Sequence, residues 1–121
     1  MNKKVMSAVL AAATVAGLAA GCMTASAEDD KLVVYGIYKA GDQTWFIDEG
    51  AAAQEAVEAA GGEFIYVDAK MNPEEYLKAI DNAVANHASG IVTCIPDQTL
   101  SQAAVDKAKD AGIPIVACDD A

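Results

Sequence analysis

The feature that most constrains the fold is a regular alternation of short apolar runs with longer, helix-like segments. The first run, Leu32–Tyr38, is apolar, β-branched and aromatic, which is typical of a strand buried on both faces of a sheet. Further runs lie at 63–67, 91–95 and 113–118, and helical segments begin near residues 44, 73 and 100. The alternation predicts an α/β, three-layer αβα fold with right-handed crossovers. Its parallel sheet should be covered on both faces, in the strand order 2-1-3-4.

The first helix has recognisable end signals. Asp42 or Thr44 is expected to cap its start near Trp45, and Gly61-Gly62 is expected to stop it. Gly50 lies within this helix and weakens it by about 1 kcal/mol relative to alanine. Small residues at this point would let the helix lie close to the sheet.

The second helix has a strong start signal. Asn72 is the expected cap, Pro73 takes the first helical position, and Glu75 can reach back as in a capping box. The only histidine, His87, lies near the end of this helix, where a solvated or capping role is the usual one.

The N-terminus has the pattern of an export signal. Two lysines within Met1–Lys4 precede an apolar stretch at 5–20, which is too short to favour a permanent membrane span. Two cleavage sites compete. Ala25-Ser26-Ala27 suits ordinary signal peptidase and would make the signal peptide 1–27, whereas an imperfect lipobox ends at Cys22, which would then carry lipid. The protein is therefore expected to be exported, either to the periplasm or to the outer face of the cytoplasmic membrane.

The charge of the chain excludes several classes of partner. The formal net charge at pH 7 is −10, and losing Lys3 and Lys4 with the signal makes it −12 for a chain that starts at Glu28. The sequence contains no arginine. An acidic chain of this kind is a poor candidate for binding nucleic acid, anionic membrane or phosphate-rich ligands.

Two cysteines follow the signal, Cys94 and Cys118, and each closes an apolar run. Neither a CxxC pair nor a Cys/His pair is present, so they predict no metal site and no disulfide framework. We expect two buried thiols that act as small hydrophobic side chains.

Polar and aromatic side chains follow the predicted strands where each strand ends. Lys39, Gln43 and Trp45 follow the first strand, and Asp119 and Asp120 follow the last. The remaining strand ends add Asp68, Thr93, Asp97 and Gln98. Because the carboxyl ends of parallel strands meet at one edge, these groups should form one rim. Carboxylates, an ammonium and an amide suit the hydroxyls of a sugar, and an aromatic face suits its C–H side.

Each rim residue also has a plain structural interpretation. Trp45 could belong to the core, Asp119-Asp120 could be a solvated turn or a helix cap, and Lys39 could be a surface lysine. Paired carboxylates can also perform acid–base catalysis. No nucleophile motif, P-loop or G-x-G-x-x-G accompanies them, however. The residues therefore favour a polar-ligand site without cofactor or metal, and not an enzyme.

Several stretches carry a resemblance to a known family. They are KLVVYGIYKAGDQTWF, AIDNAVANHASGIV, TCIPD and IPIVACDD. On these motifs the chain from Lys31 to Ala121 resembles the N-terminal lobe of the type I periplasmic sugar-binding proteins, and most of all their arabinose-binding members. The resemblance implies capture of a monosaccharide outside the cytoplasmic membrane and delivery to the permease of an ABC importer. It also implies a monomer.

The resemblance assigns roles to individual residues. It implies that Lys39 bonds sugar hydroxyls, that Trp45 packs on the ring, and that Asp120 bonds hydroxyls at the anomeric end, with Asp119 beside it. The arabinose-binding members have a glutamate where this chain has Gln43. Arabinose-, ribose- and galactose-type sugars therefore stay open as ligands.

The family has two lobes with the sugar between them, and this chain ends after its fourth strand. Residues 28–121 are thus expected to be a partial N-terminal lobe, from a fragment or a broken gene. The alternative function is a sugar-sensing ectodomain of a chemotaxis or signalling receptor. A flavodoxin-like or receiver-type protein is a weaker alternative, because a receiver has its acidic pair after the first strand. A small exported enzyme is another weaker alternative.

Overall fold

The computed structural model describes residues 31–121, which contain four strands in one sheet. The elements in chain order are β1 (Val33–Tyr38), α1 (Thr44–Ala59), β2 (Glu63–Asp68), α2 (Pro73–Ala85), β3 (Gly90–Cys94), η1 (Gln98–Leu100), α3 (Ser101–Asp110) and β4 (Ile115–Ala117). The predicted signal peptide, its two cleavage sites and Cys22 lie outside the described residues. Within the described residues, no helix is long and apolar enough to cross a membrane.

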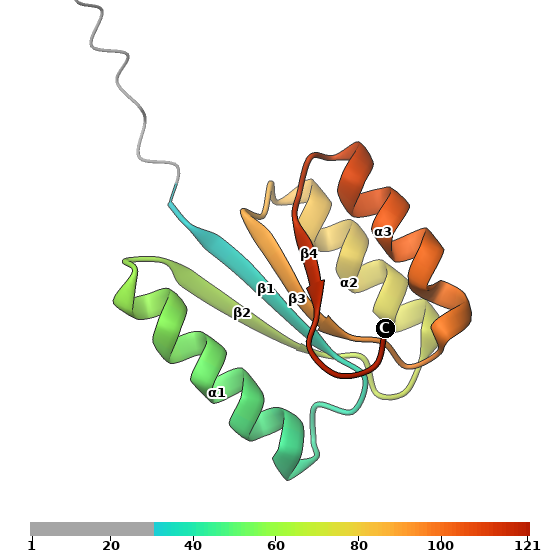
Figure 1. Cartoon of the computed structure of the whole chain (residues 1–121), viewed down its shortest axis with the longest axis horizontal. Coiled ribbons are helices and arrows are strands. Elements are labelled where there is room, and N and C mark those ends of the chain that lie inside the picture. The colour runs from blue at the N-terminus through green and yellow to red at the C-terminus, as the bar shows by residue number, and fades with distance from the viewer. Residues whose placement is uncertain (1–30) are drawn as a thin grey trace, which may run out of the picture. The chain divides into compact units, whose positions relative to one another are not determined.

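The sheet is parallel throughout, and its strand order is β2-β1-β3-β4. Helix α1 packs on one face against β1 and β2, while α2 and α3 pack together on the other face (Figure 1). The predicted α/β class, three layers and strand order are therefore confirmed. All four strands end at the same edge of the sheet, where the last residues of the chain also lie (Figure 1).

The larger core lies between the sheet and the pair α2 and α3. It is built from alternate residues of the strands, since successive side chains in a strand point to opposite faces. Tyr35, Ile37 and Ile91 are buried here against Ile80 of α2 and Ala104 of α3. Small alanines on both helices let them approach the sheet closely.

The smaller core lies under α1. It contains Tyr38 and Phe46, whose ring centroids are 5.9 Å apart. Gly50 of α1 lies directly against the ring of Tyr66, and an added Cβ would overlap it. The predicted close approach of this helix to the sheet is confirmed, because only a residue without a side chain fits there.

The face of the sheet on which α1 packs is less well covered over β3 and β4. Val116 of β4 is 61% exposed, whereas Ile115, which points to the opposite face, is partly buried against the larger core. Coverage of both faces, as the sequence predicted, is thus reached over β1 and in part over β2, where Tyr66 is 38% exposed, but not over β4 within residues 31–121.

The helix starts differ in part from the prediction. Helix α1 begins at Thr44 with Gln43 at the N-cap position, and no side chain caps it, so the expected caps from Asp42 and Thr44 are wrong. Helix α2 begins as predicted, and the Asn72 side chain accepts from the backbone N–H groups of residues 74 and 75. The Asn72 N–H donates to the Ala69 carbonyl, which leaves no bond for the predicted reach-back of Glu75.

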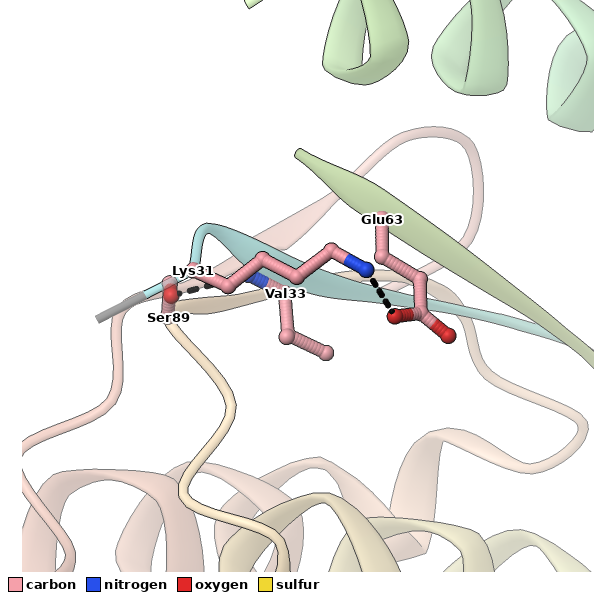
Figure 2. Close-up of polar contacts among 4 residues, drawn as sticks. All are labelled: Lys31, Val33, Glu63 and Ser89. Atoms are coloured by element: carbon pink, nitrogen blue, oxygen red, sulfur yellow. Dashed lines mark hydrogen bonds and ion pairs between the residues drawn. The ribbon is translucent and has the colours of Figure 1, made fainter. Parts of the chain in front are cut away.

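Two contacts hold the strands together at the edge of the sheet where they begin, close to the first of the described residues. The Lys31 ammonium lies 2.7 Å from a carboxylate oxygen of Glu63, and the Val33 N–H donates to the Ser89 hydroxyl at 3.0 Å (Figure 2). These contacts tie the start of β1 to the starts of β2 and β3. They lie at the opposite edge from the rim that the sequence predicted as the site.

Candidate functional site

The candidate site lies at the carboxyl edge of the sheet, where the loops that follow the four strands meet. These loops cover residues 39–43 after β1, 69–72 after β2, 95–97 after β3 and 118–121 after β4. The predicted meeting of the first and last of them is found in the structure, since Lys39 contacts Asp120 directly.

An ion pair forms the centre of the site. The Lys39 ammonium donates to the Asp120 carboxylate, and 22% of the lysine side chain and 48% of the aspartate side chain are exposed. Hydrogen bonding to this carboxylate raises the pKa of Lys39 above its ordinary value of 10.5. A donor and an acceptor, both charged and both open to solvent, therefore stand side by side.

The segment after β4 reaches Lys39 because the ladder between β3 and β4 gains two residues. The Ile91 N–H donates to the Pro114 carbonyl, and the Ile95 N–H donates to the Asp120 carbonyl. The two donors are four residues apart in the sequence, whereas the two acceptors are six residues apart. Between these bonds, Cys118 still donates regularly to the Thr93 carbonyl. The extra residues form a short turn that carries the Asp120 side chain back towards β1.

Trp45 lies in the first turn of α1 and is 68% exposed. The possibility that this indole belongs to the core is thereby excluded, and Phe46 takes that place at 3% exposure. Phe46 also has a role that the sequence did not indicate. The Lys39 nitrogen lies 5.8 Å from the centroid of its ring, close enough for a cation–π contact.

Gln43 lies on a neighbouring part of the same edge. Its exposed side chain lines an open hollow of about 280 Å³ between the loops that follow β1 and β2. The hollow is lined by Ala40, Asp42, Gln43, Asp68, Lys70 and Met71. Gln43 and Asp68 are thus brought together at the far end of the loop that begins with Lys39.

Asp119 is exposed and directly precedes Asp120 in the sequence. Its carboxylate, that of Asp120 and the sulfur of Cys94 lie within 4.8 Å of one another. Burial raises the pKa of the Cys94 thiol, which therefore stays protonated at neutral pH and is a poor metal ligand. Asp120 is already paired with Lys39. This cluster is better suited to hydrogen bonding than to holding a metal ion.

Two of the other strand-end residues have structural roles. Thr93 is 1% exposed, and its hydroxyl bonds the Ile37 carbonyl and the Tyr76 hydroxyl inside the larger core. Its predicted place on the rim is wrong, because its side chain points to the face covered by α2. Asp97 accepts from the backbone and the hydroxyl of Thr99, and these bonds lower the pKa of its carboxyl.

A parallel sheet of this topology is that of a doubly wound α/β domain, the class in which ligands bind at the carboxyl edge of the sheet. The family model described as a periplasmic binding protein domain matches residues 33–121. The chain therefore belongs to the periplasmic binding protein family, and the resemblance seen in the sequence is confirmed.

Individual relatives agree with this assignment. The chain is 36% identical over 104 residues to the L-arabinose-binding periplasmic protein of Escherichia coli (strain K12), across 86% of this chain and 31% of that protein. It is 32% identical over 123 residues to the ABC transporter L-arabinose-binding periplasmic protein of Azospirillum brasilense, across 99% of this chain and 35% of that protein. The chain spans about a third of the length of these curated relatives.

Solved structures show the same fold. One is an ABC transporter periplasmic solute binding protein from Actinobacillus succinogenes 130z with bound D-allose. It superposes with a TM-score of 0.68 at 24% identity, over 74% of this chain and 32% of that chain.

Proposed function

We propose that this chain supplies one side of a monosaccharide site in the extracytoplasmic solute-binding component of an ABC importer. The observation that carries the proposal is the exposed pair of Lys39 and Asp120 at the carboxyl edge of the sheet, with Trp45 exposed on the helix that follows β1. The names of the two arabinose-binding relatives and of the neighbour with bound D-allose support a sugar as the ligand.

The chemistry of the pair suits neighbouring hydroxyls. One sugar hydroxyl donates to the Asp120 carboxylate, and the next accepts from the Lys39 ammonium. The sugar thus binds between an acceptor and a donor that already lie side by side. Bonds to charged partners are roughly twice as strong as bonds between neutral groups. Asp119, exposed beside this pair, offers a second carboxylate acceptor.

Trp45 and Gln43 would set the choice of sugar. An exposed indole offers a flat apolar surface for the C–H side of a ring. Gln43 brings an amide that both donates and accepts, without the charge of a carboxylate. We propose a ligand of the arabinose, ribose or galactose type.

The proposed partner is the membrane permease of the importer. The Azospirillum brasilense relative and the solved neighbour are both named as ABC transporter proteins, which favours transport over a chemoreceptor role. We further propose that the protein works as a monomer without nucleic-acid partners and without catalytic activity. Its signal peptide would be residues 1–27, or would end before a lipidated Cys22.

A titration followed by nuclear magnetic resonance tests the ligand class and the site together. L-arabinose, D-ribose and D-galactose are added to the isotope-labelled chain up to about 0.5 M, because an incomplete site binds weakly. The expected result is a set of shifts confined to Lys39, Gln43, the Trp45 indole and Asp119-Asp120.

The internal control is His87, which lies at the opposite edge of the sheet, next to the Ser89 contact with β1. Its signals should not move. Shifts that are spread evenly over the surface, or that centre on His87, would contradict the proposed site.

A further inference from the structure

We infer that Tyr66 and Asp68 of the edge strand β2 are positioning residues that hold the loop between Lys39 and Gln43 in its binding geometry. This inference rests on the proposed function. Neither residue needs to touch the sugar, because both act on the backbone of Gly41, which lies between the two candidate ligand-binding side chains.

Both backbone groups of Gly41 are held by β2. The Gly41 N–H donates to Asp68 Oδ1 at 2.7 Å, and the Gly41 carbonyl accepts from the Tyr66 hydroxyl at 2.9 Å. Tyr66 and Asp68 are two residues apart, so their side chains leave the strand on the same face. The strand thus presents one donor and one acceptor to a single residue of the neighbouring loop.

Packing fixes these two side chains in turn. The Tyr66 ring stacks on Tyr38, with centroids 5.0 Å apart, and fills the space opened by Gly50. Burial of Tyr66 raises the pKa of its hydroxyl, which therefore keeps the proton that it donates. Asp68 Oδ1 also accepts from the Lys70 N–H at 2.8 Å, which joins the loops after β1 and β2 through one oxygen atom.

Gly41 itself is required by this arrangement. A Cβ added at this position would lie 2.6 Å from the Asp68 Cβ, closer than side-chain atoms approach one another. The loop therefore sits directly on β2. On one side of it Lys39 meets Asp120, and on the other side Gln43 lines the hollow.

Substitutions at Asp68 separate positioning from mere stability. Asp68→Ala removes the acceptor, whereas Asp68→Asn keeps an oxygen at the same place without its charge. Hydrogen exchange of the Gly41 amide in the chain should speed up roughly tenfold or more in Asp68→Ala, because the lost bond to a charged acceptor is of the stronger kind. It should speed up less in Asp68→Asn, whose neutral oxygen still accepts. Tyr66→Phe loses one hydroxyl and keeps the ring, so it tests the other contact if Asp68→Ala does not fold.

The matched control is Asn72→Ala. Asn72 accepts from two backbone N–H groups, as Asp68 does, and lies in the loop after β2, but its bonds go to the start of α2 and not to Gly41. Asn72→Ala should lower the melting temperature without selectively releasing the Gly41 amide.

Affinity is measured in a two-lobed protein, made by extending this sequence with the rest of the first lobe and the second lobe of a family member. We expect sugar affinity to fall about tenfold in Asp68→Ala and to be partly restored in Asp68→Asn, while Asn72→Ala binds as the wild type does. Unchanged Gly41 exchange in Asp68→Ala, or no rescue by Asp68→Asn, overturns the inference. If the wild-type two-lobed protein binds no sugar, the proposed function fails, and Gly41 exchange still decides the positioning role.

Discussion

At the scale of single residues, the contact between Lys39 and Asp120 makes the site sensitive to high pH. Because the pKa of Lys39 is raised in the folded protein, the pair stabilises the fold below the ordinary value of 10.5. This contribution is lost as the pH rises through the higher, folded-state value. The pair is partly solvent-exposed, so it should contribute only about 0.2–1 kcal/mol to the free energy of unfolding at neutral pH.

A double-mutant cycle with Lys39→Met and Asp120→Asn measures this coupling. The free energy of unfolding should show a positive coupling at pH 7 that is lost as the pH rises above 10.5 through the raised pKa of Lys39. A coupling that persists unchanged at the higher pH would mean that the contact is not an ion pair in solution.

Of the two thiols predicted to be buried, Cys94 is buried and Cys118 is only partly buried, and both should react slowly. Burial raises the pKa of Cys118 to about 12, with nearby Glu49 as the next cause, and burial also raises the pKa of Cys94. At pH 8 the Cys118 thiolate is then about one molecule in ten thousand, and only the thiolate reacts with alkylating agents. We expect iodoacetamide to modify Cys118 at least about a hundredfold more slowly in the folded chain than in urea, and to modify the buried Cys94 more slowly as well. Peptide mass mapping gives the two rates separately, and equal rates in both conditions would contradict the described burial.

At the scale of the elements, Thr93 joins three of them inside the larger core. Its hydroxyl lies 2.9 Å from the Ile37 carbonyl of β1 and 3.0 Å from the Tyr76 hydroxyl of α2. Thr93→Val keeps the shape but leaves buried polar atoms without this partner. We predict a loss of about 1–3 kcal/mol in the free energy of unfolding, measured by urea denaturation.

Thr99→Val is the control for this substitution. The Thr99 hydroxyl bonds Asp97 on the surface, where water can replace it, so the loss should be under about 1 kcal/mol. A cost at position 93 no larger than that at position 99 would show that the buried bonds contribute little to the packing of α2 on the sheet.

The elements themselves follow closely from the sequence. Apolar runs at β1 and β3, and the Asn72-Pro73 start of α2, are local signals, and the structure has all of them where they were predicted. The strand order follows from general rules for β-α-β units. Helix α1 was different, because its N-cap position falls on Gln43, which makes no side-chain cap, and not on Asp42 or Thr44.

The site was predictable only where its residues stand at strand ends. Lys39, Gln43, Trp45, Asp119 and Asp120 all have such positions, and the structure brings Lys39 and Asp120 into contact. Phe46 and Tyr66 gave no signal, because an aromatic residue inside an apolar pattern predicts core packing whether or not it also faces a ligand loop. Thr93 was misplaced because the alternation of its strand, and not its polarity, decides which way it points.

At the scale of the whole molecule, residues 31–121 would meet only one side of a ligand in the proposed site. A few hydrogen bonds that compete with water contribute about 1 kcal/mol each, or up to about 3 kcal/mol when charged. Association alone costs about 4 kcal/mol or more at the 1 M standard state. We therefore predict no measurable heat when the chain is titrated at millimolar concentrations with arabinose, ribose, galactose, glucose or xylose. A micromolar affinity for any of them would show that this lobe holds a complete site.

The most direct test of the central claim is calorimetric titration of the two-lobed protein with the same five sugars. We predict that at least one sugar binds. Trp45→Ala and Asp120→Ala should each severely weaken the affinity of the protein for that sugar, and His87→Ala should not. The circular dichroism of each variant shows that the fold is kept. Sugar binding that survives both Trp45→Ala and Asp120→Ala unchanged would contradict the assignment of the site to this edge of the sheet.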